Sequence, residues 1–156
     1  MEIQRPFVVQ KPLWGMEERI VNRKYCGKKL HILEGYRFSI QYHKKKEETF
    51  YVDEGKILLE LGDEGDAEYQ EEEFRKRIED GVLYENENFL RAVIMNPGDI
   101  IIIPRSTWHR CGSLEGTSVI TEISTHHEDS DTYKLEDAVL GVTNKIPLEV
   151  MKKYNG

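Results

Sequence analysis

Residues 35–55 read GYRFSIQYHKKKEETFYVDEG, two β-rich runs joined by a short basic turn. Alternate side chains of an extended strand point to the same face of a sheet. The first run therefore places one group of side chains on a single face: Arg37, Ser39, Gln41 and His43. Glu48 follows the turn, where the next strand can fold its carboxylate back beside His43. We expect the three lysines of the turn, residues 44–46, to be solvated.

A second stretch, PGDIIIIPRSTWH over residues 97–109, ends an apolar run with the imidazole of His109. Imidazole nitrogens together with carboxylate and amide oxygens suit a divalent cation that keeps open positions for a substrate. Convergence of the two stretches inside a barrel would form such a site. The predicted metal ligands are Gln41, His43, Glu48 and His109.

Short β-rich runs bounded by Gly and Pro surround these two stretches. This spacing is typical of an antiparallel sandwich or small barrel and argues against βαβ units. The sequence therefore predicts an all-β fold. The expected strands cover residues 29–33, 37–43, 49–52, 56–61, 89–95, 100–103 and 118–124.

Length and charge limit the possible partners. A chain of 156 residues suits a single domain, residues 1–156, with a core at about 28–125. Its 29 acidic and 22 basic residues give a net charge of −7, which disfavours nucleic acid and anionic membranes as partners. Without an apolar run of bilayer length or a secretory signal, the protein is expected in the cytoplasm. Cys26 and Cys111 are expected to be free thiols.

The acidity is concentrated in one insertion, residues 63–88, which holds eleven acidic and three basic residues. We expect a helix over residues 68–79 within it, with a thin apolar stripe of Tyr69, Phe74 and Ile78. A second short helix is expected over about residues 145–154, because Pro147 suits an early helical position. Nothing in the sequence indicates a role for the acidic insertion.

The two stretches resemble the two sequence motifs of the cupin superfamily, over about residues 35–111. The positions that match the first motif are Gly35, Gln41, His43, Glu48 and Gly55, with Gln41 in place of the first histidine. Those that match the second are Gly98, Pro104, Ser106 and His109. Ser106 stands where the motif has glycine, and Ser113 where it has asparagine. The resemblance implies a jelly-roll β-barrel.

Within the cupins, the segment from Ser39 through Gln41 to His43 is similar to that of mannose-6-phosphate isomerases. In those enzymes Gln, His, Glu and a distant His hold zinc, which implies zinc here, with manganese, iron and nickel as alternatives. The segments KPLWG at 11–15 and EDSDTYK at 128–134 also resemble parts of the type II isomerase domain. The resemblance implies a sugar or sugar-phosphate substrate. Cupins commonly dimerise, so a homodimer is expected, with residues 7–14 as a candidate interface strand.

The implied reaction is aldose–ketose isomerisation, or epimerisation, through an enediolate that the cation stabilises. Glu122 is the leading candidate for the base, because a carboxylate among apolar strand residues is costly unless it faces a wet cavity. Arg37 and Lys134 are candidates for binding a phosphate or a sugar hydroxyl. Two alternatives stay open: a cupin that binds a carbohydrate or a partner without catalysis, and an iron dioxygenase, which Gln41 disfavours.

Overall fold

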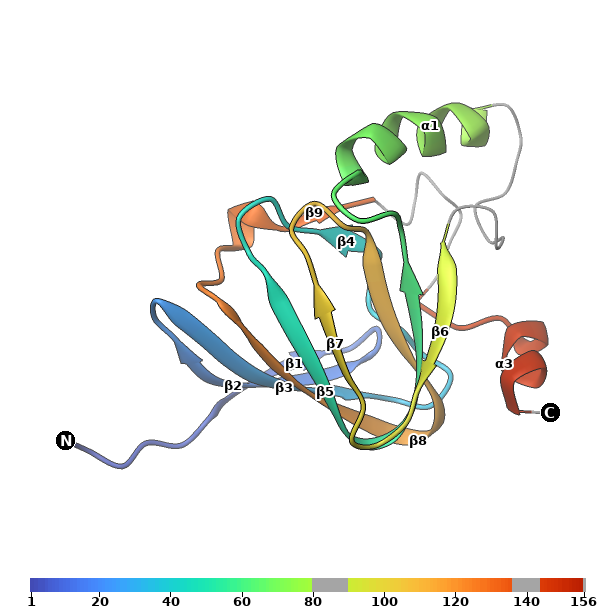
Figure 1. The fold of residues 1–156 in the computed structure, drawn as a ribbon. Helices are drawn as coiled ribbons and strands as arrows, with labels where there is room; N and C mark the ends of the chain where they lie inside the picture. The colour runs from blue at the N-terminus through green and yellow to red at the C-terminus, as the bar shows by residue number, and fades with distance from the viewer. Residues whose placement is uncertain (80–89, 136–143, 156) are drawn as a thin grey trace.

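In the computed structural model, which describes residues 1–79, 90–135 and 144–155, the strands form one antiparallel sheet that curls into a half-open barrel (Figure 1). The strands are β1 (Phe7–Lys11), β2 (Gly15–Asn22), β3 (Tyr25–Ile32), β4 (Gln41–Tyr42), β5 (Glu48–Leu61), β6 (Arg91–Met95), β7 (Ile100–Ile103), β8 (His109–Thr125) and β9 (Tyr133–Lys134). The helical elements are α1 (Ala67–Glu79), η1 (Asp129–Asp131) and α3 (Leu148–Asn155). This is the all-β cupin fold that the motifs predict.

The two longest strands, β5 and β8, form the centre of the sheet and pair along most of their length. On the other edge of β8 lies β3, which continues through β2 to β1, while β6 and β7 pair with β5. Their inward side chains alternate along each strand and make the main core. Buried members of this core include Ile32, Phe50, Val52, Ile57, Leu59 and Ile120.

Three of the expected strands, at residues 49–52, 56–61 and 37–43, differ clearly from the structure. Residues 49–52 and 56–61 belong to one strand of 14 residues, β5, because Gly55 carries it through an irregularity in its pairing with β8. The φ angle of Gly55 is 90°, and a Cβ there would lie 2.1 Å from the Ser118 hydroxyl. The strand expected at 37–43 is wrong over most of its length, since only residues 41–42 are extended and Arg37 makes an isolated bridge to Gly112.

The edge hairpin of β1 and β2 was not among the expected strands. It pairs within the chain, with Phe7 opposite Arg19 and Lys11 opposite Gly15. β1 is therefore an edge strand, and the side chain of Phe7 is 68% exposed. The homodimer that the resemblance implies stays a prediction.

The helix expected in the acidic insertion is confirmed as α1, which lies across one end of the barrel (Figure 1). Its buried residues differ from the predicted stripe: Ala67 and Phe74 pack inward, whereas Tyr69 is 74% exposed. The indole nitrogen of Trp108 donates to the carbonyl of Ala67 at 2.9 Å. Residues 80–89 of the insertion, and the side chain of Ile78, lie outside the described residues. The described part of the insertion thus packs over one end of the barrel.

The second expected helix is confirmed as α3, which begins directly after Pro147. It packs at the side of the barrel on a small cluster that contains Leu58, Leu114 and Ile146. Neither described helix is long and apolar enough to cross a membrane. Cys26 and Cys111 are buried free thiols, as expected.

A buried ion cluster links Arg37 to the β5–β8 pair. The carboxylate of Glu60 accepts two hydrogen bonds from Arg110, at 2.9 and 2.8 Å, and one from Arg37 at 3.1 Å. Burial alone would raise the pKa of Glu60, but the two guanidinium groups outweigh it and hold the pKa below its usual value. Both arginines are almost fully buried, so they depend on this carboxylate.

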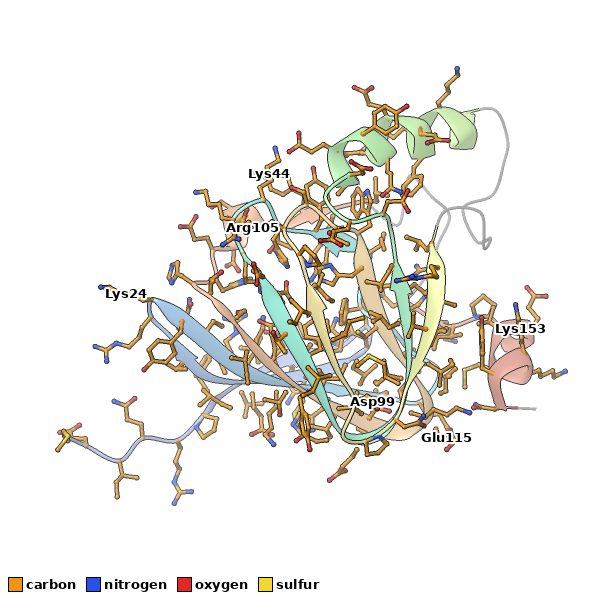
Figure 2. All side chains as sticks on the ribbon, in the orientation of Figure 1. Lys24, Lys44, Asp99, Arg105, Glu115 and Lys153 are labelled. Carbon is orange, nitrogen blue, oxygen red and sulfur yellow. The ribbon has the colours of Figure 1, made fainter. Side chains whose placement is uncertain are left out.

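Replacing Glu60 by glutamine should destabilise the protein, because two buried guanidinium groups would lose their counter-ion. We expect the free energy of unfolding to fall by about 3 kcal/mol. The control is Glu115→Gln, which removes the exposed carboxylate labelled in Figure 2, 3.6 Å from Lys56, and should cost about 0.5 kcal/mol or less. Equal urea midpoints for both variants would contradict this account of the cluster.

Candidate metal centre

Three of the four predicted ligands converge inside the barrel. The ligating atoms of His43, Glu48 and His109 all lie within 4.8 Å of one another, and all three residues are buried. His43 follows β4, while Glu48 and His109 are the first residues of β5 and β8. Segments far apart in the sequence thus bring two imidazoles and a carboxylate to one point.

The backbone sets the orientation of both imidazoles. Nδ1 of His43 lies 3.0 Å from the carbonyl oxygen of Asp131, and Nδ1 of His109 lies 3.0 Å from that of Thr107. A carbonyl only accepts, so each Nδ1 carries the proton and each Nε2 presents a lone pair. Burial, the largest influence, lowers the pKa of His109 and favours its neutral form. Such second contacts are typical of histidines that bind metals.

The two lone pairs face an anionic oxygen. Oε1 of Glu48 lies 2.6 Å from Nε2 of His43 and 3.6 Å from Nε2 of His109. Among the described residues none of these three buried atoms has a partner in hydrogen-bond geometry. Three electron-pair donors without a hydrogen between them repel one another, and a cation at their centre removes the repulsion. The donor set therefore fits a divalent metal.

Gln41, the fourth predicted ligand, lies on the strand beside His109. The two residues are direct partners in the β4–β8 pairing, so their side chains share the inner face of the sheet. Gln41 is half-buried and lines the pocket described below. Its amide is therefore placed next to the triad, on the open side.

Asp131 holds the turn that separates two of the ligands. Its buried carboxylate accepts hydrogen bonds from three successive backbone amides, those of Lys44, Lys45 and Lys46, at 3.0 to 3.1 Å. Its own carbonyl orients His43. Sequence reasoning noted the acidic segment at 128–134 but gave Asp131 no role, because its partners are more than eighty residues away.

Ser106 shows why the cupin motif has glycine at this position. Its φ angle is 53°, and among described residues other than glycine it alone has a positive φ. The left-handed region costs an L-residue about 1–2 kcal/mol. Two backbone bonds hold Ser106 there, from its amide to the carbonyl of His43 at 2.7 Å and from Ala67 to its own carbonyl at 2.9 Å. The strained residue thus ties a ligand to α1.

A pocket of about 200 Å³ opens beside the triad. Phe38 and Phe50 line it and pack edge-on against the ring of His109, at centroid distances of 6.3 and 5.9 Å. The pocket wall thus lies against a ligand side chain. Other lining residues are Trp14, Lys28, Gln41, Glu122 and Lys134.

Glu122 faces this pocket and is 2% exposed. Burial and the charge of Glu48 raise its pKa, against the lowering influence of Lys28 and Lys46. Its Oε2 lies 3.2 Å from Nζ of Lys46 and 3.9 Å from Nζ of Lys28. The structure thus places the predicted base at this pocket, with two ammonium groups beside it.

The expectation that all three lysines of the turn are solvated is wrong for Lys46, which is buried. Its side chain is 2% exposed, and its Nζ lies 3.5 Å from Glu48, 3.2 Å from Glu122 and 3.0 Å from Nδ1 of His127. Burial lowers its pKa, but the two carboxylates outweigh burial and the pKa is raised. A charged Lys46 therefore links the metal triad to Glu122. A lysine run gives no sign of which member turns inward.

The two other predicted site residues lie in different places. Lys134 lines the pocket, opposite Gln41 in the β4–β9 pairing. Arg37 instead directs its guanidinium to Glu60, and it is not among the residues that line the pocket. The cause is the irregular backbone at 35–40, which breaks the alternation on which its expected orientation depended.

Comparison with protein families gives one match, to the family described as D-lyxose isomerase, over residues 12–144. The chain belongs to this family. The match covers both stretches that carry the predicted ligands, and the description of the family names a sugar isomerase, the class of family that the motifs resemble. A comparison with curated protein sequences found no match.

Solved structures similar to this D-lyxose isomerase family member are cupins. The chain matches oxalate decarboxylase from Bacillus subtilis with a TM-score of 0.63 and 14% identity, over 97% of this chain and 34% of that one. For the capsular polysaccharide assembling protein CapF from Staphylococcus aureus the TM-score is 0.60 at 14% identity, over 84% and 34%. For KdgF from Halomonas sp. it is 0.51 at 16% identity, over 74% and 81%. The chain spans about a third of the first two proteins, and these likenesses show the fold alone.

Removing either imidazole should abolish metal binding, because only two of the three triad donors and the neutral amide of Gln41 would remain, and these hold a divalent ion weakly. We expect about one ion per chain in the parent protein and almost none in His43→Ala or His109→Ala, measured by elemental analysis after dialysis. His126→Ala removes an exposed histidine and is the control. Full occupancy in both ligand variants would show that the triad is not the metal site.

Asp131→Asn should weaken the metal site without touching a ligand, because an amide cannot accept from all three turn N–H groups. We expect the metal dissociation constant to rise about 10- to 100-fold, measured by competition with a chelator. The matched control is Asp129→Asn, whose side chain is 92% exposed. An unchanged constant in Asp131→Asn would mean that the turn holds its shape without this carboxylate.

Proposed function

We propose that this protein is a metal-dependent aldose–ketose isomerase that acts on a sugar or sugar phosphate. The observation that carries the proposal is the convergence of three unpartnered electron-pair donors next to a pocket that contains a buried carboxylate. The family description supports a lyxose-type aldose as the first substrate to test. Mannose 6-phosphate, suggested by the motif resemblance, is the second.

The metal would be held by Gln41, His43, Glu48 and His109, and zinc is our first choice. Two imidazoles, a carboxylate and an amide are borderline donors that also suit manganese, iron or nickel. When bound, a divalent cation supplies positive charge that polarises the carbonyl and neighbouring hydroxyl oxygens of an open-chain sugar. We assign the proton transfer and the exclusion of water to side chains of the protein.

Glu122 is the group that moves the proton. Its carboxylate would take the proton from C2 of the aldose and return it to C1, while the hydroxyl proton passes from O2 to O1, which leaves the carbonyl at C2 of the ketose. Its position at the pocket and its raised pKa suit a group that must be alternately base and acid. Lys46 and Lys28 hold the carboxylate in place through contacts of 3.2 and 3.9 Å.

The two phenylalanines that line the pocket and the buried Lys46 have separate roles. Phe38 and Phe50 cover the pocket side of His109 and would limit the access of water to the reacting carbons. Lys46 contacts both Glu48 and Glu122, so its charge offsets the repulsion between the two carboxylates. A base can thus be kept close to an anionic metal ligand.

The decisive experiment compares turnover with metal content. The metal-loaded protein should interconvert D-lyxose, or a related aldose of a panel that includes D-mannose and mannose 6-phosphate, with its ketose. Glu122→Gln should lower kcat by about 100-fold or more at unchanged metal content, because the amide cannot accept the proton.

Glu54→Gln, which changes an exposed carboxylate on β5, is the control and should keep its kcat. A loaded protein that binds sugars but converts none of them would sink the isomerase proposal. That outcome would instead support the alternative that the sequence left open, a carbohydrate-binding cupin.

A further inference from the structure

Strand register places a lysine in line with the metal site. Gln41 is the direct partner of His109 on one side and of Lys134 on the other. Directly paired residues of neighbouring strands direct their side chains to the same face. His109 points to the inner face of the sheet, so Lys134 shares that face, and its exposed side chain lines the open pocket.

The spacing of the three strands sets the distance between Lys134 and the metal ligands. Neighbouring strands lie roughly 5 Å apart, so the backbone of Lys134 is about 10 Å from that of His109 across β4. An extended sugar phosphate of five or six carbons measures about 8–9 Å from its carbonyl carbon to its phosphorus, which is close to this distance, whereas the free sugar is shorter. A substrate whose carbonyl end lies at the triad would therefore bring its far end to Lys134.

The pairing of the charged side chains differs between the part of the pocket near Glu122 and the part near Lys134. At the inner end, Nζ of Lys28 lies 3.5 Å from Glu17 and 3.9 Å from Glu122, so its charge is offset. Lys11, the last residue of β1, also lines the pocket and acts on Glu17 only at longer range. Within residues 1–79, 90–135 and 144–155, no carboxylate forms an ion pair with Lys134. Three lysines against two glutamates thus give the described lining of the pocket a surplus positive charge, in a protein whose net charge is −7.

We propose that Lys134, assisted by Lys11, forms an anion subsite that binds the terminal phosphate of a sugar-phosphate substrate. This inference rests on the proposed isomerase function and narrows it from a sugar to a phosphorylated sugar. The phosphate would accept hydrogen bonds from the Lys134 ammonium while the carbonyl end reaches the metal ligands. A terminal carboxylate offers the same charge chemistry with fewer acceptor oxygens, so a sugar acid is the competing source of the anion.

The test is a specificity ratio. We would measure kcat/KM for D-lyxose and D-lyxose 5-phosphate, and for D-mannose, mannose 6-phosphate and mannuronate, with the parent protein and with Lys134→Gln. The parent should prefer the phosphorylated sugar over the free sugar by about 10- to 100-fold, as expected for a hydrogen bond to a charged group. Lys134→Gln should reduce this ratio about 10-fold or more, mainly through KM.

The matched control is Lys24→Gln, which removes the same charge at the outward tip of the β2–β3 hairpin (Figure 2). It should leave the ratio of the parent unchanged. Inorganic phosphate should inhibit the parent competitively and inhibit Lys134→Gln about 10-fold more weakly.

The outcomes separate this inference from the function on which it rests. Turnover of free sugars with no preference for phosphate, or an equal loss for both sugars in Lys134→Gln, would overturn the subsite and leave the isomerase standing. A preference for mannuronate over mannose 6-phosphate would overturn phosphate as the ligand. If no sugar is converted, calorimetry with inorganic phosphate decides: binding that Lys134→Gln weakens supports the subsite without the isomerase, and equal binding overturns both.

Discussion

The arrangement of the whole molecule depends on the meeting of Oε1 of Glu48 with two imidazole lone pairs in a place that water does not reach. Without a cation this is an unfavourable group, because three acceptors face one another at low dielectric. The barrel maintains it through many weaker constraints. The fold therefore tolerates an unfavourable free energy at this one site, as proteins commonly do at functional sites.

Those constraints come from outside the triad and act mainly on the backbone. The carboxylate of Asp131 binds three consecutive amides of the turn after His43, and Ser106 stays in a strained conformation to bond the same ligand residue. The carbonyls of Thr107 and Asp131 decide which nitrogen of each imidazole is free. Lys46 contacts both Glu48 and Glu122, so its charge connects the triad electrostatically to the carboxylate at the pocket.

The acidic insertion has a structural role that its composition does not predict. Its helix α1 buries Ala67 and Phe74 against Trp108 and Tyr42, which neighbour His109 and Gln41 in the sequence. Side chains alternate along an extended chain, so the helix packs behind the residues that face the metal site. Glu68, Glu72 and Glu73 of α1 lie on the exposed side of this packing, where charge costs little.

The sequence by itself determined the β-rich fold, the cupin motif spacing, both helices and a set of ligands, three of which meet in the structure. These features depend on local periodicity and on fixed spacing within short segments, which the chain carries in its residue order. Only the tertiary structure decided that Lys46 is buried, that Asp131 organises the ligand turn and that Arg37 binds Glu60 instead of lining the pocket. Each of these contacts depends on a partner that lies tens of residues away in the sequence. The orientation of Arg37 also depends on where regular strand pairing stops, at residues 35–40. The residue order of one segment predicts neither the distant partner nor the point where pairing stops.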